Sequence, residues 1–207
     1  MKKVILTQRV DVIQAYDEKR DAIDQRWTDF LMSINILPIF ISNNLLHVEA
    51  ILSNEDIDGV ILTGGGSLIK YRGNSLERDQ VEKYIIDWAI DCNIPVLGVC
   101  RGMQFIQDYF GIPLKSVNNH VGVRHKLNVN KGLRLSALIE PFIDVNSFHN
   151  LGTSKSNRAL LAVANAEDGI VMAVEHSEKN IFGVMWHCER EDPFKIEDKD
   201  LVRHLFC

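Results

Sequence analysis

A glycine-flanked turn, Gly98-Val99-Cys100-Arg101-Gly102, constrains the fold of this chain more than any other segment. Residues 95–99 are apolar and predict a short buried strand, and residues 103–110 are compatible with a helix. Strand, sharp turn and helix around a central nucleophilic side chain form the pattern of a nucleophile elbow. The glycines permit the tight turn, and the helix N-terminus favours the thiolate of Cys100. Taken alone, however, a cysteine in such a place is more often a core residue.

Strand-like and helical patterns alternate along the first half of the chain. The expected strands cover residues 4–7, 37–42, 58–63 and 96–99, and the expected helices cover residues 21–34, 44–52 and 77–93. In the last of these helices one face carries Val81, Tyr84, Ile85 and Trp88, with Glu82, Lys83 and Asp87 elsewhere. Strands that alternate with helices imply right-handed crossovers and a mostly parallel sheet covered on both faces.

The second half of the chain has a different pattern. Three β-like runs, at residues 160–166, 170–176 and 181–186, are separated by short polar turns that are typical of antiparallel hairpins. Residues 198–206 predict a closing helix. We therefore expect one α/β domain over residues 1–207, with a mostly parallel central sheet flanked by helices and an antiparallel C-terminal extension.

Composition excludes several classes of protein. The net charge of −5 gives no electrostatic argument for binding nucleic acid or an anionic membrane. No segment approaches the roughly 20 apolar residues of a membrane span, and the N-terminus is too short and too soon charged for a signal peptide. The four cysteines are too scattered for a disulfide framework or a zinc site. We expect free thiols, no metal or cofactor, and a cytoplasmic protein.

A histidine and a glutamate follow the last β-like run, in Trp186-His187-Cys188-Glu189. Imidazole can accept a thiol proton near neutral pH and later protonate a leaving amine. A carboxylate two residues on can orient the ring, which makes Cys100, His187 and Glu189 a candidate catalytic triad for acyl transfer. The simpler interpretation is a surface histidine at the end of a strand.

Three consecutive glycines, Gly64 to Gly66, follow the third expected strand. Glycines let backbone N–H groups approach a ligand without steric hindrance from a Cβ atom. Together with the Arg101 N–H, they are candidates for an oxyanion hole. A plain turn is the competing interpretation, and a phosphate-binding loop is disfavoured because neither GK[ST] nor GxGxxG is present.

With these motifs in this order, the chain resembles a class I glutamine amidotransferase domain, and more narrowly the free-standing γ-glutamyl hydrolases of the peptidase C26 type. The resemblance rests on the glycine loop, on Arg101-Gly102-Met103-Gln104 after the nucleophile and on the segment 183–189, and it extends from about Val4 to Glu189. It implies a flavodoxin-like architecture and hydrolysis of a γ-glutamyl amide through a thioester on Cys100.

The resemblance also implies roles for further residues. His187 would act as base and then as acid, with Glu189 as its orienter. The backbone N–H groups near Gly65 or Gly66 and at Arg101 would form the oxyanion hole. Gln104 would contact the glutamyl moiety, and the backbone of the segment from Asn146 through Ser147 to Phe148 would contact its α-amino and α-carboxylate groups.

This sequence departs from the family pattern on what the resemblance implies is the leaving-group side. Cys188 replaces a proline, Ser67 replaces an aspartate, and Asn150 replaces a histidine. We therefore expect a small-molecule γ-glutamyl substrate other than the commonest γ-glutamyl amine. Positive charge at His120, Arg124 and His125, or at Lys70 and Arg72, would suit a phosphorylated or nucleotide-like leaving group, although a structural or solvent-facing role is the simpler explanation.

Several functions remain open on the sequence. The first is a free-standing hydrolase, with γ-glutamyl-polyamine and γ-aminobutyrate conjugates among its candidate substrates. The second is the glutaminase component of a two-component amidotransferase, which needs a synthetase partner. The third is a non-catalytic redox or interaction module, against which the pairing of His187 with Glu189 argues. A homo-oligomer is compatible with each of them.

Overall fold

The parallel part of the central sheet is built from strands that are buried along their whole length. The structure is a computed structural model that describes residues 1–207. β5 (Gly59–Leu62), β6 (Val96–Val99) and β14 (Ile181–Val184) contain no exposed residue. Continuous apolar runs of this kind are typical of strands covered on both faces by helices.

One eight-stranded sheet takes strands from both halves of the chain, in the order β4-β1-β5-β6-β14-β13-β12-β9. The five strands from β4 to β14 run parallel, and the pairs β14–β13, β13–β12 and β12–β9 are antiparallel. The strands not yet given are β1 (Lys2–Leu6), β4 (Ile36–Phe40), β9 (Asn128–Val129), β12 (Leu160–Asn165) and β13 (Val171–His176). This topology confirms the predicted parallel sheet with an antiparallel extension.

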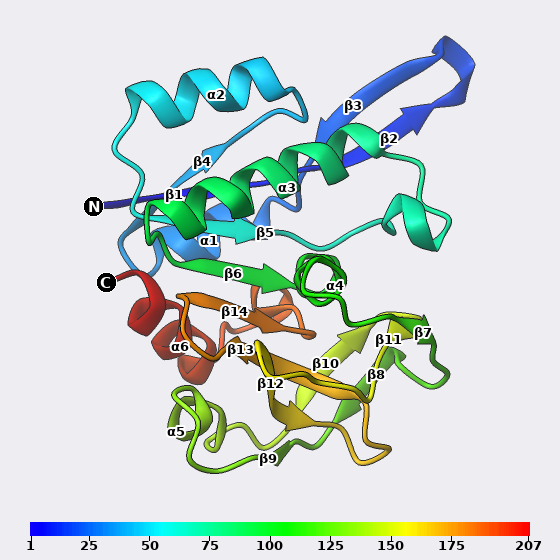
Figure 1. The fold of residues 1–207 in the computed structure, drawn as a ribbon, viewed down its shortest axis with the longest axis vertical. Coiled ribbons are helices and arrows are strands. Elements are labelled where there is room, and N and C mark those ends of the chain that lie inside the picture. Colours follow the sequence, from blue (N-terminus) through cyan, green and yellow to red (C-terminus); the bar gives the residue numbers. More distant parts are fainter.

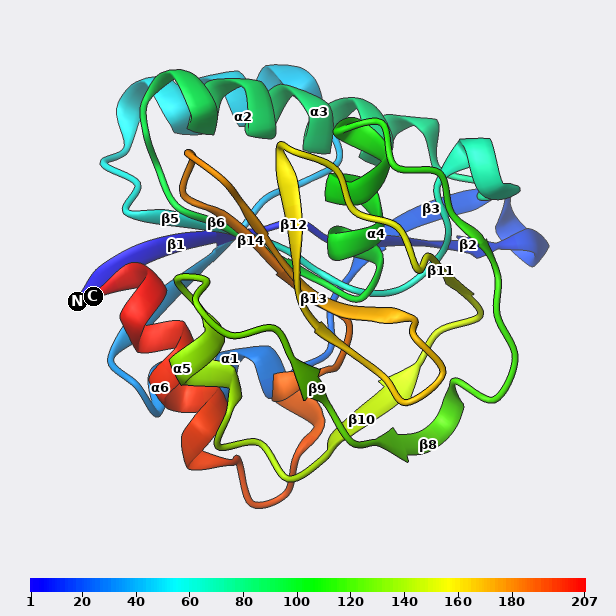
Figure 2. The same ribbon diagram turned by 60° about the horizontal axis from the view of Figure 1, so that its bottom comes forward.

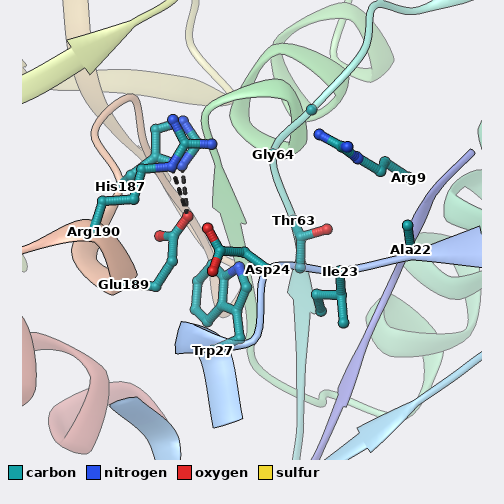
Figure 3. A pocket seen from close by; sticks show the side chains of 11 residues that line it. Arg9, Ala22, Ile23, Asp24, Trp27, Thr63, Gly64, His187, Glu189 and Arg190 are labelled. Atoms are coloured by element: carbon teal, nitrogen blue, oxygen red, sulfur yellow. Dashed lines mark hydrogen bonds and ion pairs between the residues drawn. The ribbon is translucent and has the colours of Figure 1, made fainter. Parts of the chain in front are cut away.

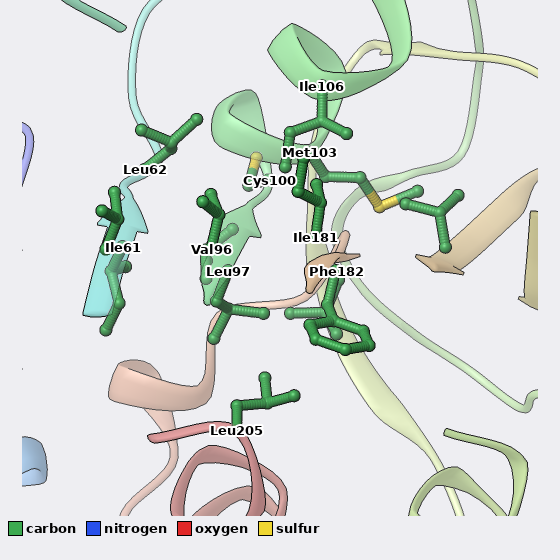
Figure 4. Packing of buried hydrophobic residues seen from close by; sticks show 14 of the residues in the cluster. Ile61, Leu62, Val96, Leu97, Cys100, Met103, Ile106, Ile181, Phe182 and Leu205 are labelled. Atoms are coloured by element: carbon green, nitrogen blue, oxygen red, sulfur yellow. The ribbon is translucent and has the colours of Figure 1, made fainter. Parts of the chain in front are cut away.

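Helices cover both faces of this sheet (Figure 1). α2, α3 and α4 lie on one face, and α1, α5 and α6 lie on the other (Figure 2). Their bounds are α1 (Arg26–Met32), α2 (Leu45–Asn54), α3 (Leu76–Asp91), α4 (Arg101–Tyr109), α5 (Ser136–Ile139) and α6 (Ile196–Phe206). The core packs from both sides, with Met103 and Ile106 of α4 above the strands and Leu205 of α6 below them (Figure 4).

Three small two-stranded sheets decorate this frame. They pair β2 (Arg9–Ile13) with β3 (Glu18–Ala22), β7 (Lys115–Ser116) with β11 (Leu151–Gly152), and β8 (Val121–His125) with β10 (Val145–Phe148). The β2–β3 hairpin projects from the body of the molecule beyond the carboxyl end of β1 (Figure 1). Short 3₁₀ turns are η1 (Gln14–Tyr16), η2 (Ile69–Tyr71) and η3 (Cys188–Arg190).

The predicted helix over residues 21–34 is wrong at its start. Asp21 and Ala22 belong to β3, and α1 begins only at Arg26, after the Asp24 carboxylate accepts the Arg26 N–H at 3.0 Å. The sequence of β3, EKRDA, shows no apolar alternation because the hairpin is solvated on both faces. The other predicted helices and the strands of the main sheet match the structure to within two residues at each end.

The sequence pattern predicted no strand at residues 121–125, which form β8; four of these five residues are exposed, so the strand has no buried face. One expectation for α3 needs correction. In α3, Val81 and Ile85 of the predicted apolar face are buried and Trp88 packs against the core, but Tyr84 is exposed, and Glu82, expected off this face, is fully buried. Glu82 is tolerated there because two arginines pair with it.

None of the helices is both long and apolar enough to span a bilayer.

The buried central strands predict a clear contrast in stability. Leu6 is inaccessible in β1, whereas Leu46 on α2 is 77% exposed. We expect Leu6→Ala to lower the free energy of unfolding by about 2–5 kcal/mol, because it removes buried contacts and leaves a cavity. Leu46→Ala, the matched control, should change it by less than about 0.5 kcal/mol. Urea denaturation measures both, and equal effects would contradict this account of the core.

Candidate active site

The functional side chains gather where the parallel strands end. Gly64 follows β5, Cys100 follows β6, and His187 follows β14, which are three neighbouring strands of the sheet. Carboxyl ends of parallel strands share one edge, which is the usual ligand site of such sheets. The strand order around β1 is that of the flavodoxin type, with its topological switch point between β1 and β5.

Cys100 itself makes the sharp turn of the elbow. Its backbone has φ 52° and ψ −102°, a conformation that side-chain-bearing residues rarely adopt, and α4 begins at the next residue. The flanking glycines serve close packing rather than unusual φ angles. A Cβ atom on Gly102 would lie 1.9 Å from the Leu62 carbonyl oxygen, and one on Gly98 would lie 2.6 Å from the Gly102 backbone. The strain is therefore concentrated on the nucleophile candidate.

His187 and Glu189 form a buried pair. His187 Nδ1 lies 2.7 Å from Glu189 Oε1, and both side chains are 2% exposed. Figure 3 shows this pair at the edge of a cavity. Burial alone would lower the pKa of His187, but interactions with the Cys100 side chain and the Glu189 carboxylate outweigh it and raise the pKa to about 9. At neutral pH the imidazole is therefore protonated.

Gly64 shows how close the histidine and the cysteine lie. A Cβ atom on Gly64 would come 2.6 Å from His187 Cε1 and 3.5 Å from Cys100 Cβ. The loop can pass over both side chains only because this residue has no side chain. The structure thus brings Cys100, His187 and Glu189 together as the sequence predicted.

Asn146 fixes the backbone of the histidine. Its side-chain oxygen accepts the His187 N–H at 2.9 Å, and its amide donates to the His187 carbonyl at 2.9 Å and to Glu191 at 2.8 Å. The Ser147 hydroxyl is buried and donates to the His120 carbonyl at 2.7 Å. Of the predicted substrate segment from Asn146 to Phe148, only Phe148 lines the cavity beside Cys100.

Two cavities meet at His187. One, of about 100 Å³, is lined by Cys100, Gln104 and Phe148 and by the loop residues Gly65, Gly66, Ser67, His149 and Asn150. The other, of about 180 Å³, also borders His187 and is drawn in Figure 3. Both cavities are bounded by Gly65, His187 and Arg190. Cys188 is buried and lines neither.

The glycine loop is held by an arginine from α3. Arg78 donates to the carbonyl oxygens of Thr63 at 2.6 Å and of Gly65 at 2.7 Å. Gly65 and Gly66 have φ angles of 90° and 76°, and their N–H groups take part in none of the backbone hydrogen bonds outside the regular elements. The Arg101 N–H lies in the first turn of α4, where the helix provides no acceptor. These N–H groups are thus available to a ligand.

A buried charge network joins this loop to the elbow. Glu82 accepts hydrogen bonds from Arg78 at 2.8 Å, from the Thr7 hydroxyl at 2.9 Å and from the guanidinium of Arg101. The Arg101 side chain also pairs with Asp79. Burial alone would raise the pKa of Glu82, and the two guanidinium groups outweigh it and lower the pKa. Sequence reasoning missed this network because the pattern of α3 placed Glu82 on a polar face.

The basic residues considered as alternatives for the leaving-group side lie elsewhere, in agreement with the simpler structural or solvent-facing interpretation. His120 is buried and bonds to Asp168 at 2.9 Å, with the His125 ring 4.2 Å away. Arg124 pairs with Asp144 and Glu191, and Lys70 pairs with Asp108. Neither these residues nor Arg72 lines the two cavities at His187. Instead the second cavity is lined by Arg9 and Arg190, which the sequence motifs did not indicate. The adjacency of Arg190 to Glu189 was the available signal.

Comparison with known proteins identifies the class. Over its full length the chain matches, with a TM-score of 0.72, the fold of a Thermoplasma acidophilum protein assigned as a GMP synthase subunit, at 20% identity and 92% coverage of that chain. A Campylobacter jejuni gamma-glutamyl-CDP-amidate hydrolase is 34% identical over 90% of both chains. A glutamine-hydrolyzing GMP synthase subunit from Methanobrevibacter smithii is 29% identical over 74% of both chains. The fold is thus that of a glutamine amidotransferase.

A family model assigns the chain to a narrower group than the fold does. Residues 4–189 match the peptidase C26 family, and this range includes every residue of the candidate triad. The chain belongs to the peptidase C26 family and is a hydrolase.

The raised pKa of His187 predicts the alkaline limit of activity. An imidazolium is needed to protonate a leaving nitrogen, so kcat/KM should fall as the pH rises through about 9. Glu189→Gln removes one of the interactions that raise this pKa, so the alkaline limb should move to lower pH. NMR titration of His187 measures the same shift directly. Glu178→Gln, an exposed control, should leave the limb in place, and an unmoved limb in Glu189→Gln would contradict the pairing.

If the charge network positions the glycine loop and the elbow, breaking it should lower kcat more than it raises KM. Glu82→Gln weakens the anchors of Arg78 and Arg101, so we expect kcat to fall about 10- to 100-fold with a smaller change in KM. Loss of the buried charge should also lower the free energy of unfolding by about 3–5 kcal/mol. Glu77→Gln, on the same helix, is the control. If Glu82→Gln does not fold, Arg78→Lys tests the same anchor, and an unchanged kcat in a folded variant would refute it.

Proposed function

We propose that this protein cleaves a γ-glutamyl amide through a γ-glutamyl thioester on Cys100. The observation that carries the proposal is a cysteine on a strained elbow beside a buried histidine, which a buried carboxylate holds and whose pKa its neighbours raise. A protonated imidazole next to a thiol is the arrangement that activates cysteine nucleophiles. Membership of the C26 family and similarity to a gamma-glutamyl-CDP-amidate hydrolase support the choice of acyl group.

The proposed reaction proceeds in two halves. The Cys100 thiolate attacks the γ-carbonyl carbon, and the oxyanion forms against the N–H groups of Gly65 or Gly66 and Arg101. His187 donates its proton to the leaving nitrogen as the bond between that nitrogen and the γ-carbon breaks, which leaves a thioester. His187 then accepts a proton from water, the hydroxide attacks the thioester, and glutamate leaves as Cys100 is regenerated.

The cavity beside Cys100 suits the glutamyl group. Gln104 is buried in its wall and is fixed by donating to the Leu151 carbonyl at 3.0 Å. The ring of Phe148 lies edge-on to His187, with 5.9 Å between ring centroids, and closes the opposite side. We propose these two residues as contacts for the glutamyl moiety, with the backbone of Phe148 as a further contact.

For the substrate we propose γ-glutamyl-CDP-amidate, which would give glutamate and cytidine diphosphoramidate. Similarity to the Campylobacter jejuni hydrolase over 90% of both chains supports this choice. A glutaminase that supplies ammonia to a separate synthetase is the second candidate, favoured by similarity to the Methanobrevibacter smithii GMP synthase subunit. Turnover of glutamine in isolation, and its stimulation by a partner, distinguishes the two.

A substrate panel tests the proposal. Wild type and Cys100→Ala are compared on γ-glutamyl-CDP-amidate, glutamine, γ-glutamyl polyamines and folate polyglutamates. We expect γ-glutamyl-CDP-amidate to have the highest kcat/KM and Cys100→Ala to lower it at least about a thousandfold. Rapid acid quench followed by mass spectrometry should find a glutamyl adduct on Cys100 in wild type.

The buried Cys188 offers a matched control, because Cys188→Ala removes a thiol that lines neither cavity. It should retain activity and the adduct. Full activity in Cys100→Ala, or in His187→Ala, would overturn the mechanism. A preference for glutamine over the nucleotide amide would overturn the substrate.

A further inference from the structure

The second cavity at His187 is a separate compartment that the chemistry at Cys100 does not explain. It has about 180 Å³ and is lined by Arg9, Asp24, Trp27 and Arg190, in addition to Gly64, Gly65 and the His187–Glu189 pair. Because His187 borders both cavities, a substrate whose glutamyl group occupies the Cys100 side extends past the histidine into this one. The proton of His187 is then delivered at the boundary, where the scissile nitrogen lies.

The charges around this cavity favour an anion. Its two carboxylates are paired with cations. Glu189 pairs with His187 through Oε1, which also lies 3.6 Å from Arg190 Nε, and its Oε2 is buried without a hydrogen bond. Asp24 pairs with Arg26, with a closest contact of 2.6 Å. A hydrogen bond from Arg26 outweighs burial and lowers the pKa of Asp24 to about 2. The guanidinium groups of Arg9 and Arg190 are left as the cations that face the cavity from opposite walls (Figure 3).

Neither arginine is fully occupied within the protein. The only ion pair of Arg9 is an exposed one with Asp11, a type of contact that contributes little. The aliphatic part of Arg9 packs on the glycine loop, where a Cβ atom on Gly65 would lie 2.9 Å from Arg9 Cδ. Arg190 pairs with Glu189, with 3.6 Å between Nε and Oε1, and its guanidinium lies over the Phe148 ring at 4.9 Å from the centroid, but its buried Nε has no hydrogen-bond acceptor. A buried unpartnered donor is costly, so an acceptor that enters this cavity is stabilised there.

The position in the sheet agrees with a ligand site. Arg9 follows β1 and Gly65 follows β5, the two strands that flank the topological switch point. Thr63 joins the ends of these strands, donating from its hydroxyl to the Thr7 carbonyl at 2.7 Å. In open α/β sheets the crevice at this point is where ligands bind.

We propose that Arg9 and Arg190 form the leaving-group subsite and select a leaving group with a phosphoryl anion next to the scissile nitrogen. This inference rests on the proposed γ-glutamyl hydrolase function. Guanidinium groups match phosphoryl oxygens in charge and in paired hydrogen-bond geometry. The specificity determinant then lies away from His120, Arg124, His125, Lys70 and Arg72.

Paired substrates test the proposal. Arg9→Gln and Arg190→Gln are assayed on γ-glutamyl-CDP-amidate and on γ-glutamyl-p-nitroanilide, whose leaving group is neutral. Each variant should lose about 10- to 100-fold in kcat/KM on the nucleotide amide, because charged hydrogen bonds are removed. Arg9→Gln should change less than about threefold on the anilide. Arg190 also borders the cavity beside Cys100 and pairs with Glu189, so Arg190→Gln should lose activity on the anilide as well, but at least about fivefold less than on the nucleotide amide. Arg20→Gln, on the same hairpin and outside the cavity, should behave as wild type on both.

Inhibition of anilide hydrolysis identifies the recognised group. Inorganic pyrophosphate and CDP should inhibit wild type competitively, and the inhibition should weaken at least about tenfold in Arg9→Gln and Arg190→Gln. Cytidine and γ-aminobutyrate should inhibit neither the wild type nor the two variants. Inhibition by γ-aminobutyrate but not by pyrophosphate would overturn the phosphoryl assignment.

The subsite and the hydrolase activity fail in different ways. Loss of both activities to the same extent in Arg9→Gln and Arg190→Gln would overturn the subsite while leaving γ-glutamyl hydrolysis intact. If Cys100→Ala hydrolyses both substrates as fast as wild type does, or if wild type hydrolyses neither, the proposed function itself fails. Binding of pyrophosphate to Cys100→Ala, measured by calorimetry, then still reports on the arginines.

Discussion

The buried carboxylate of Glu82 is the interaction on which the rest of the site depends. Through Arg78 it holds the carbonyl side of the glycine loop, and through Arg101 it holds the first residue of α4. These two segments carry the N–H groups that we assign to the oxyanion hole. Because a buried charge without its partners is very costly, the network has one well-defined arrangement. Helix α3 thus fixes the relative positions of two strand ends without contacting the nucleophile.

Besides the charge network, close steric packing around glycine residues also constrains the backbone of the elbow. Gly102 packs against the Leu62 carbonyl so closely that no side chain fits, and Gly64 lies against both Cys100 and His187. Glycine at these positions permits contact between backbones rather than freedom of rotation. The unusual φ angle is carried by Cys100 itself, and interlocked packing on both sides keeps that strained conformation in place. Preorganisation of this site is therefore a property of packing as much as of hydrogen bonding.

The sequence was informative wherever burial imposes a pattern. The apolar runs of β5, β6 and β14 predicted the parallel sheet, and Cys100 with His187 and Glu189 at strand ends predicted their meeting. The β2–β3 hairpin was not predictable, because a solvated strand such as EKRDA has no apolar alternation. For the same reason Arg9 gave no signal. Glu82 was missed because helical periodicity treats every charged residue as solvent-facing, although its partners are brought together only by the folded chain.

The β2–β3 hairpin separates two properties of this hydrolase. Cys100, His187 and the glycine loop follow strands of the central sheet, whereas Arg9 stands at the base of a hairpin that projects from it (Figure 1). Within the hairpin, the side-chain hydrogen bonds to the body are exposed ones, from Lys19 to Glu77 and from Asn43 to Asp21, so most of its residues can vary at little cost to the sheet. Divergence of this short segment would therefore change what lies beside the second cavity without disturbing the strand ends that carry Cys100 and His187.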